Sequence, residues 1–123
     1  MRNKRILALA IGAALATVPA AAHHSFAMFD MTRNVTTTGT VTEFRWTNPH
    51  AWLHLDVADA AGTTNNWAIE MTSPNNLVKT GWRRSSLKLG DKVTVDFHPL
   101  VNGKKGGSLA KVTLANGMVL ENK

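Results

Sequence analysis

The chain has 123 residues, enough for one domain, with 14 basic residues, 8 acidic residues, 5 histidines and no cysteine. The lack of cysteine excludes disulfides, thiolate metal sites and cysteine nucleophiles. Three of the 14 basic residues lie within residues 1–5, which leaves 11 against 8 acids and a net charge of +3 for the rest of the chain. Such a mild charge does not indicate nucleic-acid binding, so we expect no nucleic-acid partner.

The first 22 residues have the three parts of a secretory signal peptide. A basic stretch at residues 1–5 precedes an apolar, uncharged run from Ile6 to Val18, and small residues end at Ala22. The apolar run is shorter than the ~20 residues that span a bilayer. We therefore expect cleavage after Ala22 and a periplasmic or secreted protein, with no stable membrane span after cleavage.

The rest of the chain is predicted to be mostly β, because runs of β-branched and aromatic residues alternate with turn residues. In the first run, Asn34–Trp46, the early apolar residues Val35 and Val41 lie at odd positions, whereas Phe44 and Trp46 lie at even positions. A β-bulge near Gly39 or Glu43 would let both pairs face the same side of the sheet. In His50–Val57 the apolar residues alternate strictly. The residues predicted to point into the core are Ala51, Leu53, Leu55, Val57, Trp67, Ile69, Met71, Val93, Val95 and Phe97.

A short helix is predicted from Ser73-Pro74, a typical helix start, to Gly81, a typical stop. The other predicted segments are the strands Asn66–Met71, Lys92–His98, Ser108–Leu114 and Met118–Asn122 and a mobile loop at Val101–Gly107. Three strands, a helix and two or three further strands are the order of a small five- to six-stranded OB-type barrel. A plain β-sandwich is the alternative. We expect an N-terminal segment at residues 23–34 and a single barrel domain at residues 35–123.

The predicted mature N-terminus could act as a chelating group for a metal ion. Cleavage after Ala22 would expose the α-amine of His23 beside its own imidazole, so that one residue supplies two nitrogen ligands. One more imidazole would complete a three-nitrogen site of the kind that favours copper. His24 is the nearest candidate, but neighbouring side chains diverge, so a histidine of the barrel would serve better. The alternative is that His23 and His24 form a polar terminus without a metal.

Three further histidines, His50, His54 and His98, are candidate metal ligands. His50 and His54 share one face of a predicted strand but lie about 13 Å apart at ~3.3 Å per residue. Ligand nitrogens approach a common ion to about 2.1 Å, so these two are not expected to form a pair. Either of them could combine with His98 on a neighbouring strand. The alternative for each is a surface histidine that makes ordinary hydrogen bonds.

A second candidate surface combines aromatic and cationic residues. Trp52 is predicted to lie on the polar face of its strand, where an exposed indole can bind a ligand or a partner. Arg83 and Arg84 follow the predicted helix and could contact an acidic partner. The alternative is a solvated turn at the helix exit. The complete predicted partner face consists of Trp46, Trp52, Trp82, Arg83 and Arg84.

Four segments of the sequence are distinctive: HHSFAMFD, GTVTEFRWTNPHAWLHLDV, WAIEMTSPNNLVKTGWRRSSLKLGDKVTV and FHPLVNGKKGGSL. They resemble a family of short exported proteobacterial proteins of unknown function, and the likeness covers nearly all of the mature chain. This resemblance implies an exported, single-domain, mostly β protein. At the level of fold the chain is also similar to periplasmic OB-barrel copper chaperones, which bind Cu(I) with His, Met and a capping Trp. Met28, Met31 and Met71 are available for that role, although the ligand spacing of those proteins is not recognisable.

These features predict a non-enzymatic exported binding protein that takes copper through His23, with no other cofactor. No Ser/His/Asp set, glycine-rich phosphate loop or pair of carboxylates indicates catalysis. The alternative is a metal-free module that docks on an exported enzyme or envelope complex through Trp52, His50 and the corner formed by Trp82, Arg83 and Arg84. A small oxidative copper enzyme is a third hypothesis, which the lack of an evident substrate groove disfavours.

Export can be tested on the protein as it is secreted. Mass spectrometry of the secreted form should show a chain that begins at His23, because signal peptidase reads the small residues that precede it. Any other first residue would remove the chelating amine and contradict the copper hypothesis.

Overall fold

The computed structural model describes residues 26–123. The predicted signal peptide and the two histidines His23 and His24 lie outside the described residues. The elements in chain order are a 3-10 helix η1 (Phe26–Met28), β1 (Val35–Arg45), β2 (Trp52–Ala58), β3 (Thr64–Glu70), α1 (Pro74–Lys79), β4 (Lys92–Pro99), β5 (Gly106–Leu114) and β6 (Val119–Glu121).

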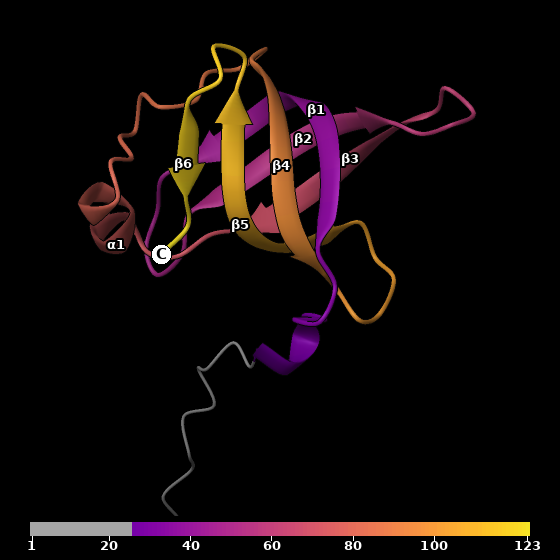
Figure 1. Ribbon diagram of the computed structural model, residues 1–123, viewed down its shortest axis with the longest axis horizontal. Helices are drawn as coiled ribbons and strands as arrows, with labels where there is room; N and C mark the ends of the chain where they lie inside the picture. Colours follow the sequence, from indigo (N-terminus) through magenta and orange to yellow (C-terminus); the bar gives the residue numbers. More distant parts are fainter. Residues whose placement is uncertain (1–25) are drawn as a thin grey trace, which may run out of the picture.

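The strands form one sheet in the order β3-β2-β1-β4-β5-β6, and a further pairing of β3 with β5 closes the first five into a barrel. All pairs are antiparallel except the closing pair, which is parallel. Figure 1 shows β4, β5 and β6 crossing over β2 and β3, with α1 at one end of the barrel. A closed five-stranded barrel with one extra strand and one short helix after the third strand confirms the predicted OB-type architecture.

Strand β1 is long because it belongs to both halves of the barrel. Its first half pairs with β4 and its second half with β2, and the register shifts between Val41 and Glu43. This irregularity confirms the predicted bulge, which lets Val41 and Phe44 both pack on the core despite their opposite parity. A side chain at Gly39 would place its Cβ 2.9 Å from the backbone oxygen of Asp56, so only glycine fits where the strand bends.

The core follows the predicted alternation of apolar residues. Leu53, Leu55, Ile69, Val95 and Phe97 have no exposed surface, and Trp67 is partly buried with its ring 5.5 Å from that of Phe97. The inward sides of β2, β3 and β4 are therefore the ones predicted from sequence.

The predicted helix forms over six residues as α1. Ser73 caps it by accepting a hydrogen bond from the backbone N–H of Asn76, and Pro74 fills its first turn. Leu77 is completely buried, so the helix closes one end of the core. Gly81 follows the helix with a φ of 95°, a left-handed conformation that glycine adopts without strain.

One prediction about the loops is wrong. Gly106 and Gly107 were expected to belong to a mobile loop, but both are buried in β5, where they pair with Ala68 and Ile69 of β3. A Cβ on Gly106 would lie 2.6 Å from the backbone oxygen of Ala68, and a Cβ on Gly107 would overlap the backbone of His98. Two strands therefore approach this closely because neither glycine carries a side chain.

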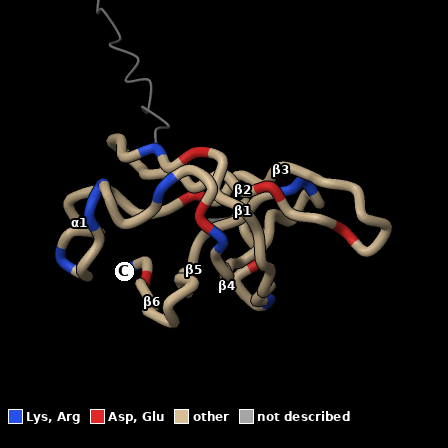
Figure 2. The backbone as a smooth tube through the Cα atoms, turned by 90° about the horizontal axis from the view of Figure 1, so that it is seen from above, with Lys and Arg blue, Asp and Glu red and all other residues tan. Residues whose placement is uncertain are grey.

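The charged residues are dispersed over the barrel. Figure 2 shows Lys and Arg segments interspersed with Asp and Glu segments around the described chain. Among residues 26–123, no helix has both the length and the apolar character needed to cross a membrane.

Truncation of a core side chain tests the inward alternation. Leu55→Ala should lower the free energy of unfolding by about 2–5 kcal/mol, because Leu55 is completely buried and its loss leaves a cavity. Leu89→Ala, at a side chain that is 72% exposed, is the matched control and should change the free energy by less than about 0.5 kcal/mol. Urea unfolding of both variants measures the difference. Equal effects would contradict the assignment of the inward face.

The closing strand pair can be tested at Gly106. Gly106→Ala should lower the free energy of unfolding by about 1–3 kcal/mol, since the new methyl group can be accommodated only if the backbone of β3 moves away. Hydrogen exchange should show faster exchange of the Ala68 amide, which donates to the Lys105 carbonyl at the closing pair. A variant as stable as the wild type, with unchanged exchange at Ala68, would contradict the closure of the barrel between β3 and β5.

Candidate functional site

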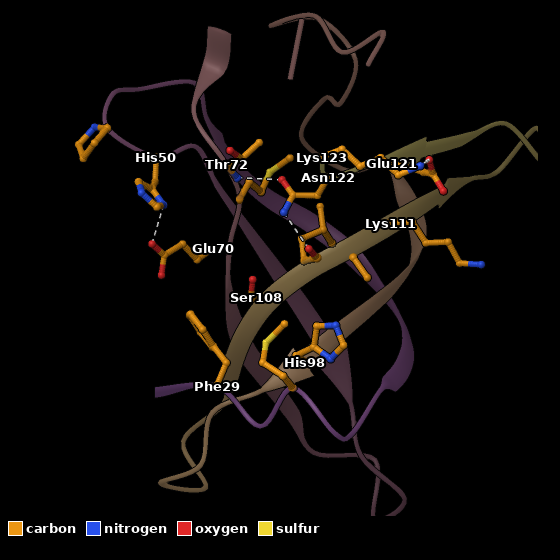
Figure 3. A pocket seen from close by; sticks show the side chains of 15 residues that line it. Phe29, His50, Glu70, Thr72, His98, Ser108, Lys111, Glu121, Asn122 and Lys123 are labelled. Carbon is orange, nitrogen blue, oxygen red and sulfur yellow. Dashed lines mark hydrogen bonds and ion pairs between the residues drawn. The ribbon is translucent and has the colours of Figure 1, made fainter. Parts of the chain in front are cut away.

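The outer side of the closing strand pair carries a cleft with a volume of about 780 Å³. Its floor contains Glu70 of β3 and Ser108 of β5, which are directly paired. A cleft of this size is within the range that holds a small ligand. Figure 3 shows the side chains around it, which are Phe29, Met31, Pro49, His50, Glu70, Met71, Thr72, His98, Ser108, Leu109, Ala110, Lys111, Glu121, Asn122 and Lys123.

A histidine and a glutamate meet at one side of the cleft. The Nδ1 atom of His50 lies 2.7 Å from Oε1 of Glu70, and the two side chains are 35% and 5% exposed. Backbone hydrogen bonds from Ala51 to Thr72 and from Met71 to Ala51 hold the loop before β2 against the chain that leaves β3. This connection brings His50 next to Glu70, the last residue of β3.

His98 lies at the other side of the cleft. Ser108 is paired with Glu70 on one side and with His98 on the other, so Glu70 and His98 are separated by two strand spacings, about 10 Å between Cα atoms. The Nδ1 atom of His98 lies 2.8 Å from the backbone oxygen of Arg33. A backbone carbonyl can only accept a hydrogen bond, so Nδ1 carries a proton, and in the neutral form of the ring Nε2 is the nitrogen with the lone pair.

A tight turn positions the carbonyl that binds His98. The carboxylate of Asp30 accepts hydrogen bonds from the hydroxyl and the backbone N–H of Thr32, and the backbone of Arg33 donates to the Asp30 carbonyl. The hydrogen bond from the Thr32 hydroxyl is the main cause that holds the pKa of Asp30 below its usual value. The turn is thereby fixed in a conformation that presents the Arg33 carbonyl to the barrel.

The segment before β1 forms an apolar wall of the cleft. Phe29 is buried and forms a β-bridge with Leu100, and Asp30 donates a backbone hydrogen bond to Pro99. Val101 donates in turn to the backbone of Met28. These bonds attach the N-terminal segment to the end of β4 and to the loop after it, so that Phe29 and Met31 line the same cleft as the two histidines.

The chain after β6 forms the opposite wall. The side chain of Asn122 accepts from the backbone of Thr72 and donates to the Leu109 carbonyl. These two bonds tie the C-terminal residues to β5 and to the segment before α1. Lys123 forms an ion pair with Glu121 at this wall, and both side chains are at least half exposed.

The predicted histidine ligands do not gather at one point. His54 lies outside the cleft, in a polar network with Asn66 at 3.4 Å and Glu43 at 3.8 Å. In residues 26–123, no three side chains of the His, Cys, Asp or Glu type are close enough to hold a metal ion together. His50 and His98 line one cleft but come from opposite sides of Ser108. Each of them could therefore supply one nitrogen to a site that takes its other ligands from elsewhere.

The prediction that Trp82 belongs to an exposed partner face is wrong. This indole has no exposed surface, packs 5.9 Å from the ring of Phe44, and donates from Nε1 to the backbone carbonyl of Glu121. A Trp at the end of a helix looks like a surface anchor in the sequence, but here the chain after α1 turns back onto the core. Arg83 and Arg84, which follow it, are exposed as predicted.

The two other tryptophans of that face are half-buried. Trp46 packs edge-on against Phe44 with the ring centroids 5.7 Å apart. Trp52 begins β2 on its outer side and is paired with Arg45 and Glu70. The five predicted residues therefore do not form one exposed surface.

Sequence reasoning missed Glu70, which is the most buried charged residue of the described chain at 4% exposure. The position of Glu70 on the polar side of its strand is typical of a solvated acid, and nothing local distinguishes it from one. Phe29 and Arg33 were also missed, because their contacts are made across the barrel to Leu100 and His98.

The family of this chain is decided by sequence comparison. A model of a family of unknown function, DUF6152, matches residues 12–110. The chain belongs to this family. No curated protein is similar enough to count as a relative.

A search of solved structures supports the fold of this DUF6152 protein. The mitochondrial single-stranded DNA-binding protein Rim1 of S. cerevisiae matches with a TM-score of 0.50 and 15% sequence identity, over 74% of this chain and 97% of that chain. At this identity the likeness shows the OB-type fold alone.

Proposed function

We propose that this protein is an exported, non-enzymatic copper-binding protein. Its site combines the amine and imidazole of His23, after signal cleavage at Ala22, with one imidazole from the cleft of the barrel. Three nitrogen donors suit copper better than the other divalent ions of the first transition series.

The observation that carries this proposal is the position of Phe29. Phe29 lines the cleft that also holds His50 and His98, and it follows His23 by six positions in the chain. The 3-10 helix η1 (Phe26–Met28) rises about 2.0 Å per residue, so these six positions span less than the ~20 Å of an extended chain. Because Phe29 is bridged to Leu100, a mature N-terminus would stay near the cleft that holds both imidazoles.

The other donors around the cleft support the same ion. Met31 and Met71 both line it, Met31 with an exposed side chain and Met71 with a side chain buried in the core, and thioether sulfur is a soft ligand that favours Cu(I). The cleft thus offers nitrogen donors to Cu(II) and sulfur donors to Cu(I), which fits a protein that holds or transfers copper. The docking hypothesis loses support because Trp82, one of the five residues of its predicted partner face, is completely buried.

Blocking the N-terminal amine tests the copper site. One extra residue before His23 should weaken Cu(II) binding as much as His23→Ala does, because it converts the chelating amine into an amide and leaves the ring unchanged. Calorimetric titration of Cu(II) into the mature protein, the extended protein and the alanine variant measures this effect. A chain extended by one residue after Lys123 is the control and should bind Cu(II) like the mature protein. Equal affinities for the mature and N-terminally extended proteins would contradict the proposed site.

A further inference from the structure

We propose that residues 78–92, which run from the last turn of α1 to the first residue of β4, form a docking surface for an anionic lipid bilayer. This segment carries five basic residues and one acid, whereas the rest of the described chain carries six basic residues and seven acids. The whole positive balance of the described chain therefore lies in this segment. The proposal uses no residue that lines the cleft, so it is independent of the copper site.

The positive charges of the segment are available to an external anion. All five basic side chains are exposed, and within residues 26–123 none of them forms an ion pair with a carboxylate. These residues are Lys79, Arg83, Arg84, Lys88 and Lys92. The one acid, Asp91, is engaged locally, because its carboxylate accepts a hydrogen bond from the backbone N–H of Lys88. Positive charge that no acid compensates attracts the headgroups of anionic lipids.

Three buried side chains keep these charges on the outside of the barrel. Leu77, Trp82 and Leu87 lie five positions apart in the chain, and all three belong to the hydrophobic core. The two residues that follow each of them are exposed, and these pairs are Val78-Lys79, Arg83-Arg84 and Lys88-Leu89. Each buried side chain is thus followed by at least one basic residue on the solvent side. A backbone hydrogen bond from Gly90 to Val41 fixes the end of the segment on β1.

Exposed aliphatic side chains among these cations favour a lipid bilayer over other anionic partners. Leu89 is 72% exposed, the highest value for a large apolar side chain in the described chain, and Val78 is 47% exposed. Proteins that bind the surface of a bilayer combine basic residues with apolar side chains that enter the headgroup region. A single-stranded nucleic acid would instead stack its bases on aromatic side chains. The one aromatic residue of the segment, Trp82, is completely buried.

The loop between β4 and β5 supplies matched control positions. Figure 1 shows α1 at one end of the barrel and this loop at the other. The loop carries two adjacent exposed cations, Lys104 and Lys105, and the exposed apolar side chain of Val101. Substitutions there change the net charge or the apolar surface as much as substitutions in residues 78–92, but at a distant place.

Binding to vesicles tests the role of the charges. The secreted protein should sediment with vesicles of phosphatidylglycerol and phosphatidylcholine but not with vesicles of phosphatidylcholine alone, and about 0.5 M NaCl should release it by screening. The double variant Arg83→Gln/Arg84→Gln should bind the anionic vesicles about tenfold more weakly or less, since each cation near the surface contributes to the attraction. The control variant Lys104→Gln/Lys105→Gln loses the same charge and should bind within about twofold of the wild type, because charges far from the bilayer are screened.

The same measurement tests the apolar contact. Leu89→Ala should weaken binding to the anionic vesicles about threefold or more, because a shorter side chain buries less apolar surface in the headgroup region. Val101→Ala is the control and should bind like the wild type. All variants have the same N-terminus, so a difference between them belongs to the substituted residues. Circular dichroism of each variant confirms that the barrel is folded.

Three results would overturn the proposal. The first is equal binding to neutral and anionic vesicles. The second is an equal loss of binding in the arginine and the lysine double variants, which would show attraction by net charge without a defined surface. The third is binding of an acidic peptide or a single-stranded oligonucleotide through Arg83 and Arg84 by a protein that does not bind the vesicles.

Discussion

The parallel pairing of β3 with β5 is the interaction on which the rest of this structure depends. Without it the strands would form an open, bent sheet, and the core residues between its halves would be exposed. The pairing is possible because Gly106 and Gly107 let the backbones of two distant segments approach without a Cβ between them. The two glycines are therefore buried although the residues before them form an exposed, lysine-containing loop.

The same pairing creates the candidate site. It places Glu70 beside Ser108, and Ser108 beside His98, so that three strands contribute polar residues to one row on the outer side of the barrel. The loop before β2, the segment before β1 and the residues after β6 then surround this row and form the cleft. Because the walls come from three separate parts of the chain, the site exists only when the barrel is closed.

Much of the architecture could be predicted from local sequence. The alternation in His50–Val57 identified the buried side of β2, the change of parity in Asn34–Trp46 located the bulge of β1, and Ser73-Pro74 marked the start of α1. These features are local because strand and helix periodicity, bulges and caps depend on residues a few positions apart. The order of elements then favoured an OB-type barrel over a sandwich, as the structure and the comparison with Rim1 both show.

What the sequence determined by itself was therefore the strands, their inward faces, the short helix and the supply of histidines. Only the tertiary structure decided that Trp82 is a core residue, that two glycines of an apparent loop close the barrel, and that Glu70 is buried against His50. The physical reason is that burial and ion pairing depend on contacts between residues far apart in the chain. An acid on the polar side of a strand is expected to be solvated until the loop before β2 brings His50 against it.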